Sequence, residues 1–408
     1  MVSVKKEGVI LEATDLEFEN QAVLNPACIK DKNNVHMFYR AVGKDFRSCV
    51  GYCKLDGPLK VAQRSQKPIL FPENDYEKQG VEDPRIVCID ETYYMLYTAY
   101  DGKNALIAYA VSKDLIKWEK KGVISPKIKY NDVREIFLNS KLKDRYFFFK
   151  SFYKEVKGED VLLWEKDAIL FPKKINGKFA LIHRILPDIQ VIYFDDFKQL
   201  ADMDYWKRYL ETLPNYIILE PKYWYESRNI GGGCPPIETE KGWIFIYHAV
   251  QNAENYRVYH AAAALLDKAN PTKIRGRLEK PLFSPELDWE LQGDVNNVVF
   301  PEGAAIFDDR LYIYYGAADK RIGVASVSTA ELLNELLPGQ VTYQMNYEIG
   351  KIAGEIYRMC KDTPRNLSEI RNTLKRKEDL IYLAIGWLSR ENKIEFLSSQ
   401  GDMKIKTK

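Results

Sequence analysis

The sequence predicts an all-β fold, a five-bladed β-propeller, followed by a small α+β winged helix-turn-helix domain. Two observations predict it: a layout that recurs through residues 1–338, and a helical spacing of apolar residues within 346–408. Each recurrence has a proline, a short strand, a polar turn, an aromatic strand and then a polar or small residue. The recurrences are residues 25–41, 83–99, 171–185, 235–249 and 300–317.

The opening strands of these repeats are expected to meet. In a propeller, similar antiparallel units pack radially around a central channel, and the first strand of each blade lines the axis. Residues near the leading prolines then converge on one pocket; they are Asn25, Asp83, Arg85, Lys166, Pro236 and Glu302. Residues that close the second strands approach the same mouth; they are Arg40, Thr98, His183, His248 and Gly316.

The second repeat opens with a charged motif, "GVEDPRI" at residues 80–86. Pro84 cannot donate to a sheet ladder, so it belongs at the start or edge of a strand. Asp83 therefore lies at a strand mouth, where its side chain can face a cavity. Arg85 follows two residues later, and the strand period of two places both side chains on one face. This arrangement makes Asp83 a candidate catalytic residue.

Two segments depart from the repeats. Residues 119–170 are longer than a blade connection requires and contain the aromatic run "RYFFFKSFY". This run is expected to be a strand, so the segment is interpreted as the outer strands of one blade plus an insertion near the pocket. Residues 196–214 have helical spacing and are expected at the rim.

The C-terminal residues 346–408 predict three helices and a hairpin. The first helix covers 349–361, the second starts at Asn366 or Ser368, and the third starts at the acidic pair Glu378–Asp379. Two short strands follow, separated by Gln400–Gly401. In a DNA-binding winged-helix domain the third helix meets DNA phosphates. The acidic start of the third helix here therefore argues against a nucleic-acid partner and against a DNA-associated regulator. A packing or homo-oligomerisation module is favoured.

The bulk composition sets further limits. The net charge is +2, so the protein has no strong positive electrostatic field that would indicate binding to nucleic acid or to an anionic membrane. Six cysteines without metal or disulfide spacing, and only four histidines, predict neither a metal nor a cofactor. The N-terminus has no signal-peptide pattern and no segment is long and apolar enough to span a bilayer, so we expect a cytoplasmic protein with no membrane partner.

Several motifs together resemble glycoside hydrolase family 130, the mannoside phosphorylases and related mannosidases. They are "FENQAVLNPA" (18–27), "GVEDPRI" (80–86), "AYAVSKDLIKWEKKGVISP" (108–126), "KDAILFPKKINGKFALIHR" (166–184), "GGGCPPIETEKGWIFIYHA" (231–249) and "VVFPEGAAIFDDRLYIYYGAADK" (298–320). The resemblance covers residues 8 to about 335 and implies a five-bladed propeller. Residues after 346 resemble a small winged-helix domain of some bacterial and archaeal proteins.

The resemblance implies roles for individual residues. The family's lone catalytic acid falls on Asp83, and its phosphate-binding lysine and histidine fall on Lys166 and His183, with Arg184 nearby. The remaining sugar contacts are expected at Asn25, Arg40, Glu82, Arg85, Asp101, Glu238, Tyr247 and Glu302. Two positions depart from the family. The further arginine that phosphorylases contribute shortly after the acid motif has no clear counterpart, since that stretch offers only Lys103. The family's "KIG" reads "NIG" here, with Arg228 just before it.

The implied activity is inverting cleavage of β-mannosidic bonds in oligosaccharides. Phosphorolysis would use inorganic phosphate as co-substrate and release α-mannose 1-phosphate, with Asp83 as proton donor. A donor that is protonated at neutral pH needs a raised pKa, from burial or from Glu82, whereas Arg85 acts in the opposite direction. One alternative is an inverting β-mannosidase with Glu238 or Glu302 as the base that activates water. The other is a glycan-binding propeller without catalysis.

Overall fold

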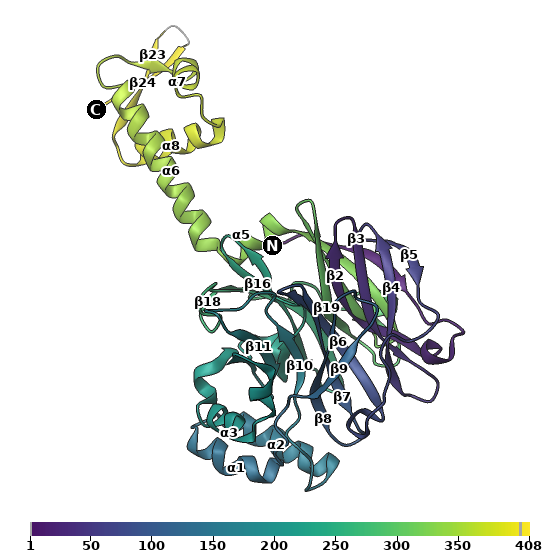
Figure 1. Ribbon diagram of the computed structural model, residues 1–408. Helices are drawn as coiled ribbons and strands as arrows, with labels where there is room; N and C mark the ends of the chain where they lie inside the picture. The colour runs from purple at the N-terminus through teal and green to yellow at the C-terminus, as the bar shows by residue number, and fades with distance from the viewer. Residues whose placement is uncertain (1, 400–401) are drawn as a thin grey trace. The chain divides into compact units, whose positions relative to one another are not determined.

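The chain divides into two compact units, Met1–Leu336 and Leu337–Lys408. The structure is a computed structural model and describes residues 2–399 and 402–408. In these ranges no helix combines the length and the apolar character that crossing a membrane requires. Figure 1 shows the course of the chain through both units.

The larger unit is built from antiparallel meanders that follow one another along the chain. An eight-stranded sheet holds the first two meanders, which are joined by a single parallel bridge between Ser48 and Gly80. The first comprises β2 (Ala22–Asp31), β3 (Asn34–Val42), β4 (Ser48–Asp56) and β5 (Lys60–Arg64). The second comprises β6 (Gly80–Ile89), β7 (Thr92–Tyr100), β8 (Ala105–Ser112) and β9 (Glu119–Val123).

The other sheets of this unit repeat the pattern. The third meander comprises β10 (Lys166–Leu170), β11 (Phe179–Arg184), β12 (Ile189–Phe194) and β13 (Ile217–Leu219). The fourth comprises β14 (Asn229–Gly232), β15 (Ile237–Thr239), β16 (Gly242–Asn252), β17 (Arg257–Leu266) and β18 (Ile274–Arg277). The last comprises β19 (Val299–Phe307), β20 (Arg310–Ala317) and β21 (Arg321–Ser328), and its outer position is taken by β1 (Val4–Leu11) from the N-terminus.

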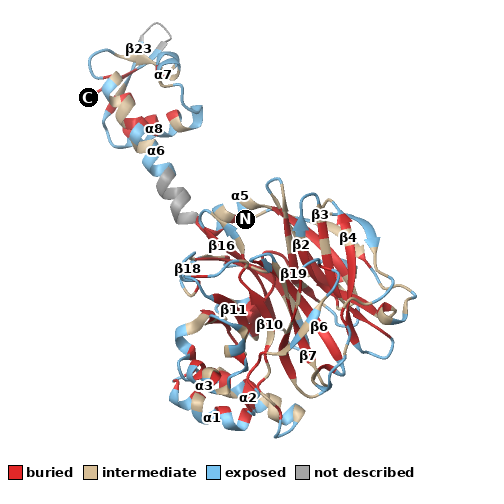
Figure 2. Ribbon diagram, in the orientation of Figure 1, coloured by how far each residue is buried: buried red, intermediate tan, exposed pale blue. Residues whose placement is uncertain are grey.

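Neighbouring meanders contact one another through their opening strands. β2 contacts β6, β6 contacts β10, and β10 contacts β14. β19 contacts β16 of the fourth meander and β2 of the first, so the series returns to its start. The apolar core lies between adjacent sheets; for example, Val35 of β3 and Val324 of β21 belong to one buried cluster. Figure 2 shows the buried residues concentrated along these strands.

The segment between β9 and β10 folds differently from the sequence prediction. It forms α1 (Tyr130–Asn139) and α2 (Asp144–Lys157), and the run "RYFFFKSFY" lies in α2 instead of a strand. Aromatic residues favour strands, but this run has helix signals at both ends. Asp144 is in the first turn, Lys154 and Lys157 are in the last, and Gly158 (φ 92°) ends the helix.

The remaining helices of this unit are short. They are α3 (Met203–Glu211), α4 (Asp288–Leu291) and α5 (Thr329–Leu336). The helical prediction for 196–214 is confirmed by α3 and by the 3-10 turn Phe197–Ala201 before it. Figure 1 shows α1, α2 and α3 gathered on one side of this unit.

The smaller unit has the predicted winged-helix elements. They are α6 (Pro338–Met359), β22 (Arg365–Asn366), α7 (Leu367–Leu374), α8 (Glu378–Arg390), β23 (Ile394–Ser399) and β24 (Asp402–Thr407). The predicted start of the second helix is confirmed, because the Asn366 side chain accepts from the Glu369 backbone N–H as an N-cap. The turn predicted at Gln400–Gly401 lies outside the described residues.

Candidate active site

Three opening strands place a polar side chain at a local irregularity. The pairing register shifts between Leu24 and Pro26, between Glu82 and Arg85, and between Lys166 and Ile169. In each shift one residue has a left-handed backbone; these residues are Asn25 (φ 49°), Asp83 (φ 51°) and Asp167 (φ 58°). Asparagine and aspartate tolerate this conformation better than other side chains, and such bulges re-aim a side chain out of the regular alternation.

These irregularities direct the three side chains into one cavity of about 350 Å³. Three carboxylates line it, from Asp83, Asp167 and Asp319. The cationic side chains that line it are Arg40, Lys166, Arg184, Arg228 and Arg257. Its other polar or aromatic residues include Asn25, Tyr153, Asn229, His248, Tyr259 and Phe300. The cations outnumber the carboxylates, so the cavity favours a ligand with negative charge and many hydrogen-bonding groups.

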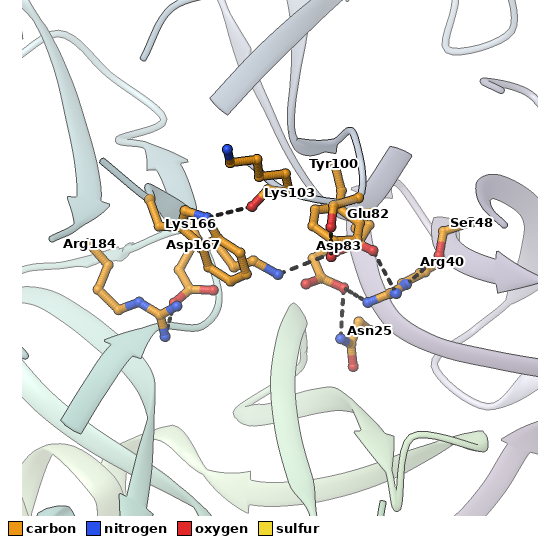
Figure 3. A network of polar contacts seen from close by, with 12 residues as sticks. Asn25, Arg40, Ser48, Glu82, Asp83, Tyr100, Lys103, Lys166, Asp167 and Arg184 are labelled. Atoms are coloured by element: carbon orange, nitrogen blue, oxygen red, sulfur yellow. Dashed lines mark hydrogen bonds and ion pairs between the residues drawn. The ribbon is translucent and has the colours of Figure 1, made fainter. Parts of the chain in front are cut away.

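Asp83 is held by partners from neighbouring strands (Figure 3). Asn25 Nδ2 donates to Asp83 Oδ1 over 2.9 Å, and Arg40 Nη1 donates to the same oxygen over 3.3 Å. The adjacent Glu82 accepts from Arg40 (2.8 Å) and pairs with Lys166 (3.3 Å). Glu82 therefore positions the two cations that flank Asp83, and it is not itself among the side chains lining the cavity.

The protonation of Asp83 differs from the sequence expectation. Burial raises the pKa of Asp83, but the charges of Arg40, Lys166 and Arg85 and the hydrogen bond from Asn25 outweigh burial and lower the pKa to about 2. Glu82 does not supply the expected rise, because its charge is paired with Arg40 and Lys166. In the ligand-free protein Asp83 is thus a carboxylate at neutral pH. An anion bound beside the same cations would offset their effect and raise this pKa.

The third carboxylate in the cavity has a different environment. Asp319 lies in the turn between β20 and β21 with a left-handed backbone (φ 50°). Burial raises the pKa of Asp319 to about 6, although Arg40 acts in the opposite direction. The two carboxyl groups therefore differ in protonation at acidic pH, between about 2 and about 6, where Asp83 is ionised and Asp319 holds its proton.

Arg85 and Glu302 are not in the cavity, which corrects the prediction that they contact sugar. Arg85 donates to the carbonyl oxygens of Asp83 (2.8 Å) and Gly232 (3.2 Å), and its Nη2 lies 2.8 Å from Glu302 Oε1. Glu302 is fully buried, and burial raises its pKa well above the usual range. The pair therefore joins opening strands beneath the site, and Glu302 has no access to a water nucleophile.

Three more predicted sugar contacts lie elsewhere. Glu238 pairs with Lys173 and Lys268 near the surface. It lies in β15 beside Trp243, at the start of β16, whereas His248 lies towards the other end of that strand. Tyr247 is buried in the core, where its hydroxyl donates to Glu226 Oε1 (2.8 Å). Asp101 accepts from the backbone N–H groups of a turn, at 2.6–2.7 Å. None of the three lines the cavity, because strand alternation and turn bonding direct their side chains away from it.

The structure also corrects the prediction that His183 binds phosphate. His183 is buried between Glu165 (2.6 Å) and the Tyr209 hydroxyl (2.7 Å), outside the cavity. His248 lines the cavity instead, 3.5 Å from Arg184 Nη1. Burial lowers the pKa of His248 to about 4, so it is a neutral donor or acceptor at pH 7. Lys166 and Arg184, the other predicted phosphate ligands, do line the cavity.

Arg228 lines the cavity and packs beside two aromatic rings of α2. The guanidinium carbon of Arg228 lies 5.4 Å from the ring centre of Phe149 and 5.5 Å from that of Phe152. Burial and the nearby Arg257 lower the pKa of Arg228, which marks a concentration of positive charge. The same helix contributes Tyr153 to the cavity. The helical insertion is therefore part of the site.

Sequence reasoning missed Asp167, Arg257, Asp319 and Tyr153 as site residues. Asp167 had a detectable signal, because "KD" at 166–167 lies near the start of its opening strand, as "ED" at 82–83 does in the second meander. Arg257 is the first residue of β17, Asp319 lies in a turn and Tyr153 in a helix of the insertion, and no repeat pattern identifies these positions. In residues 2–399 and 402–408 no cluster of three or more His, Cys, Asp or Glu side chains is arranged to hold a metal ion.

Gly231 of β14 permits the close packing of Asp167 and His248. A Cβ atom at this position would lie 2.3 Å from Asp167 Oδ2 and 2.3 Å from His248 Cε1. We therefore expect Gly231→Ala to lower the free energy of unfolding by about 1–3 kcal/mol and to weaken anion binding. Chemical denaturation and phosphate titration measure both effects. Gly386→Ala is the matched control, because a Cβ there meets no atom within 4 Å; equal stability of the two variants would contradict this packing.

The repeated antiparallel sheets and the cation-rich cavity at their opening strands define a repeat β-sheet protein with a central site that favours an anionic, hydrogen-bonding ligand. Family models identify it further. The chain belongs to glycoside hydrolase family 130, whose model is described as β-1,4-mannooligosaccharide phosphorylase and matches residues 8–337. Residues 344–407 match the model of a winged helix-turn-helix domain.

Individual relatives agree with this assignment. The chain is 36% identical over 346 residues to a 1,2-β-oligomannan phosphorylase of Thermoanaerobacter sp. (strain X514), covering 81% of this chain and 99% of the relative. It is 37% identical to a β-1,2-mannobiose phosphorylase of the same organism, covering 80% and 97%. A β-1,2-mannobiose phosphorylase from Listeria innocua, solved with β-1,2-mannobiose, has the same fold (TM-score 0.61, 22% identity, covering 82% and 99%).

Proposed function

We propose that this protein is a phosphorylase of β-1,2-linked mannosides, built on a five-bladed β-propeller. The propeller assignment is supported by the ring of contacts among the opening strands and by β1, which completes the last meander from the N-terminus. The linkage is supported by the names of the two Thermoanaerobacter relatives. A sugar phosphate is charged and does not cross membranes freely, so the enzyme would work in the cytoplasm.

The observation that carries the proposal is the excess of cations beside Asp83. A hydrolase needs a carboxylate base for water, and the two glutamates predicted for that role lie outside the cavity. A phosphorylase needs an anion site, which Lys166, Arg184 and Arg228 supply, with His248 as a neutral partner. Phosphate in this cluster would lie close to Asp83, because Lys166 contributes to the low pKa of Asp83.

The proposed reaction follows from these positions. A phosphate oxygen attacks the anomeric carbon of the terminal mannose, and the bond from that carbon to the glycosidic oxygen breaks. The leaving oxygen takes a proton that originates from Asp83, directly or through a sugar hydroxyl. Attack from the face opposite the leaving group inverts the configuration, so the product is α-mannose 1-phosphate. The negative charge of bound phosphate offsets Arg40 and Lys166, which raises the pKa of Asp83 towards the value a donor needs.

The linkage preference is tested with a panel of disaccharides. β-1,2-Mannobiose and β-1,4-mannobiose are incubated with the protein and inorganic phosphate, and mannose 1-phosphate is quantified by chromatography. We expect faster release from the β-1,2 disaccharide. Faster release from the β-1,4 disaccharide would contradict the proposed linkage, and ligand binding without any product would identify a non-catalytic glycan-binding propeller.

A further inference from the structure

The third helix of the winged-helix unit, α8, exposes an apolar face. One side of this helix packs into the core of the unit through Ile381, Ala384, Ile385 and Leu388. The other side carries Tyr382 (46% exposed), Leu383 (48%) and Trp387 (42%). Large apolar side chains that gather on one exposed face are typical of an interaction surface.

Opposite charges lie at the two ends of the same face. Asp379 is in the first turn of α8 and Arg390 is in the last, and both are exposed. They are separated by about three helical turns, so they lie on the same side of the helix. In the part of the chain that the structure describes neither forms an ion pair, whereas the adjacent Glu378 is paired with Arg371. The face is therefore an apolar strip with a free acid at one end and a free base at the other.

The aromatic ring of Trp387 has a fixed position on this face. A Cβ atom at Gly350 of α6 would lie 3.1 Å from Cζ3 of Trp387, so the ring packs directly over this glycine. The ring also lines a groove of about 650 Å³ between α6 and α8. A large aromatic side chain that is held in place yet half-exposed is a suitable anchor for a partner, because little conformational entropy is lost on binding.

This face does not match nucleic acid. In a DNA-binding winged-helix domain the exposed side chains of the third helix meet phosphates and base edges. Here the middle of that face is apolar and its first turn is acidic. The matching surface is instead an apolar helix face whose charged ends have the opposite order.

A second copy of α8 has this order when it runs antiparallel to the first. A two-fold axis that crosses the helix between residues 384 and 385 places Asp379 opposite Arg390 of the second copy. It also places Tyr382 opposite Trp387 of the second copy and brings the two Leu383 side chains together beside the axis. Two-fold symmetry repeats each contact, so the acid and the base pair twice. The antiparallel helix dipoles attract one another as well.

We propose that the exposed face of α8 is the interface at which two copies of this chain pair, antiparallel about this axis. The apolar centre supplies most of the affinity, because exposed ion pairs contribute little free energy and mainly fix the orientation of the partners. The proposal concerns assembly, so it goes beyond the proposed enzymatic function and does not depend on it.

The first test measures the molar mass of the full chain by sedimentation over a range of protein concentrations. Leu383→Glu places two carboxylates beside the two-fold axis, and we expect it to raise the dissociation constant of the pair about 100-fold and to halve the mass of the assembly. Phe396→Glu is the matched control, since Phe396 is 46% exposed on β23, outside this face, and we expect its mass to be unchanged. A monomer at every concentration of the unmodified protein, or an unchanged mass in Leu383→Glu, would overturn the proposal.

Charge reversal tests the antiparallel arrangement itself. Asp379→Arg and Arg390→Asp each place like charges opposite one another, so we expect each to weaken the pair about tenfold. The double variant restores both ion pairs with their signs exchanged, and its dissociation constant should return to within about threefold of that of the unmodified protein. A double variant that is weaker than either single variant would overturn the proposed pairing, because residues 379 and 390 would then not face one another.

Discussion

Replacing Asp83 with asparagine is expected to lower kcat for phosphorolysis of β-1,2-mannobiose by roughly 1,000-fold, since a positioned proton donor contributes about 10²–10⁴-fold. The amide keeps the shape of the side chain, and its oxygen still accepts from Asn25 and Arg40. Binding of the disaccharide should therefore remain within a few-fold, and the fold should be unchanged. Steady-state kinetics and calorimetric titration measure the two effects separately.

The control for Asp83→Asn is Glu238→Gln. It makes the same change from carboxylate to amide, but at a near-surface position paired with Lys173 and Lys268. We expect its kcat to equal that of the unmodified protein. If Asp83→Asn kept more than about a tenth of the original kcat, Asp83 could not be the proton donor, and Asp319, whose pKa is raised to about 6, would be the next carboxylate to test.

Replacing Arg184 with alanine is expected to raise the KM for phosphate by about 30-fold, because a charge-assisted hydrogen bond contributes about 1.5–3 kcal/mol. The KM for the disaccharide should change much less. Arg184 Nη1 lies 2.9 Å from Asp167 Oδ2, and its loss leaves Asp167 with Arg85 at 3.6 Å, so the carboxylate keeps a cationic neighbour. Initial rates at varied phosphate, with saturating disaccharide, give the value.

Arg134→Ala is the matched control for Arg184→Ala. Arg134 is exposed on α1 and pairs with its neighbour Glu135, away from the cavity. We expect no change in either KM. An unchanged KM for phosphate in Arg184→Ala would place the anion elsewhere, and an equal rise in both KM values would indicate general damage to the cavity.

The repeated architecture could be predicted because it depends on local patterns. Hairpin turns, leading prolines and aromatic strands recur through the chain, and each is readable in a short window. The same repeats placed Asn25, Asp83 and Lys166 on one pocket, and all three line the cavity. The strand prediction for residues 145–153 was wrong. It gave the strand propensity of aromatic residues more weight than the helix signals at the two ends of α2, which are its terminal charges and Gly158.

The errors within the site come from side-chain direction. Tyr247 and His248 are adjacent in β16, so one faces the core and the other the cavity, and only the strand register decides which. The same problem separates His183, which is buried between Glu165 and Tyr209, from Arg184, which lines the cavity. Motif matching identifies the strand but not the side on which each residue lies.

Other site residues depend on long-range contacts that no local window contains. Arg228 reaches the cavity with Phe149 and Phe152 of α2 beside it. Asp319 is defined by a turn, and Tyr153 by a helix inserted between two sheets. These positions follow from the packing of segments far apart in the chain, so the sequence alone could not assign them.

The most direct test of the account is combined ³¹P and ¹H NMR of the purified protein with β-1,2-mannobiose, with and without inorganic phosphate, because ³¹P spectra detect the sugar phosphate and ¹H spectra detect free mannose. The account predicts α-mannose 1-phosphate and free mannose in equal amounts when phosphate is present, and no cleavage when it is absent. Free mannose released at the same rate in both samples would contradict it, because the cations beside Asp83 would then not serve to bind the attacking group.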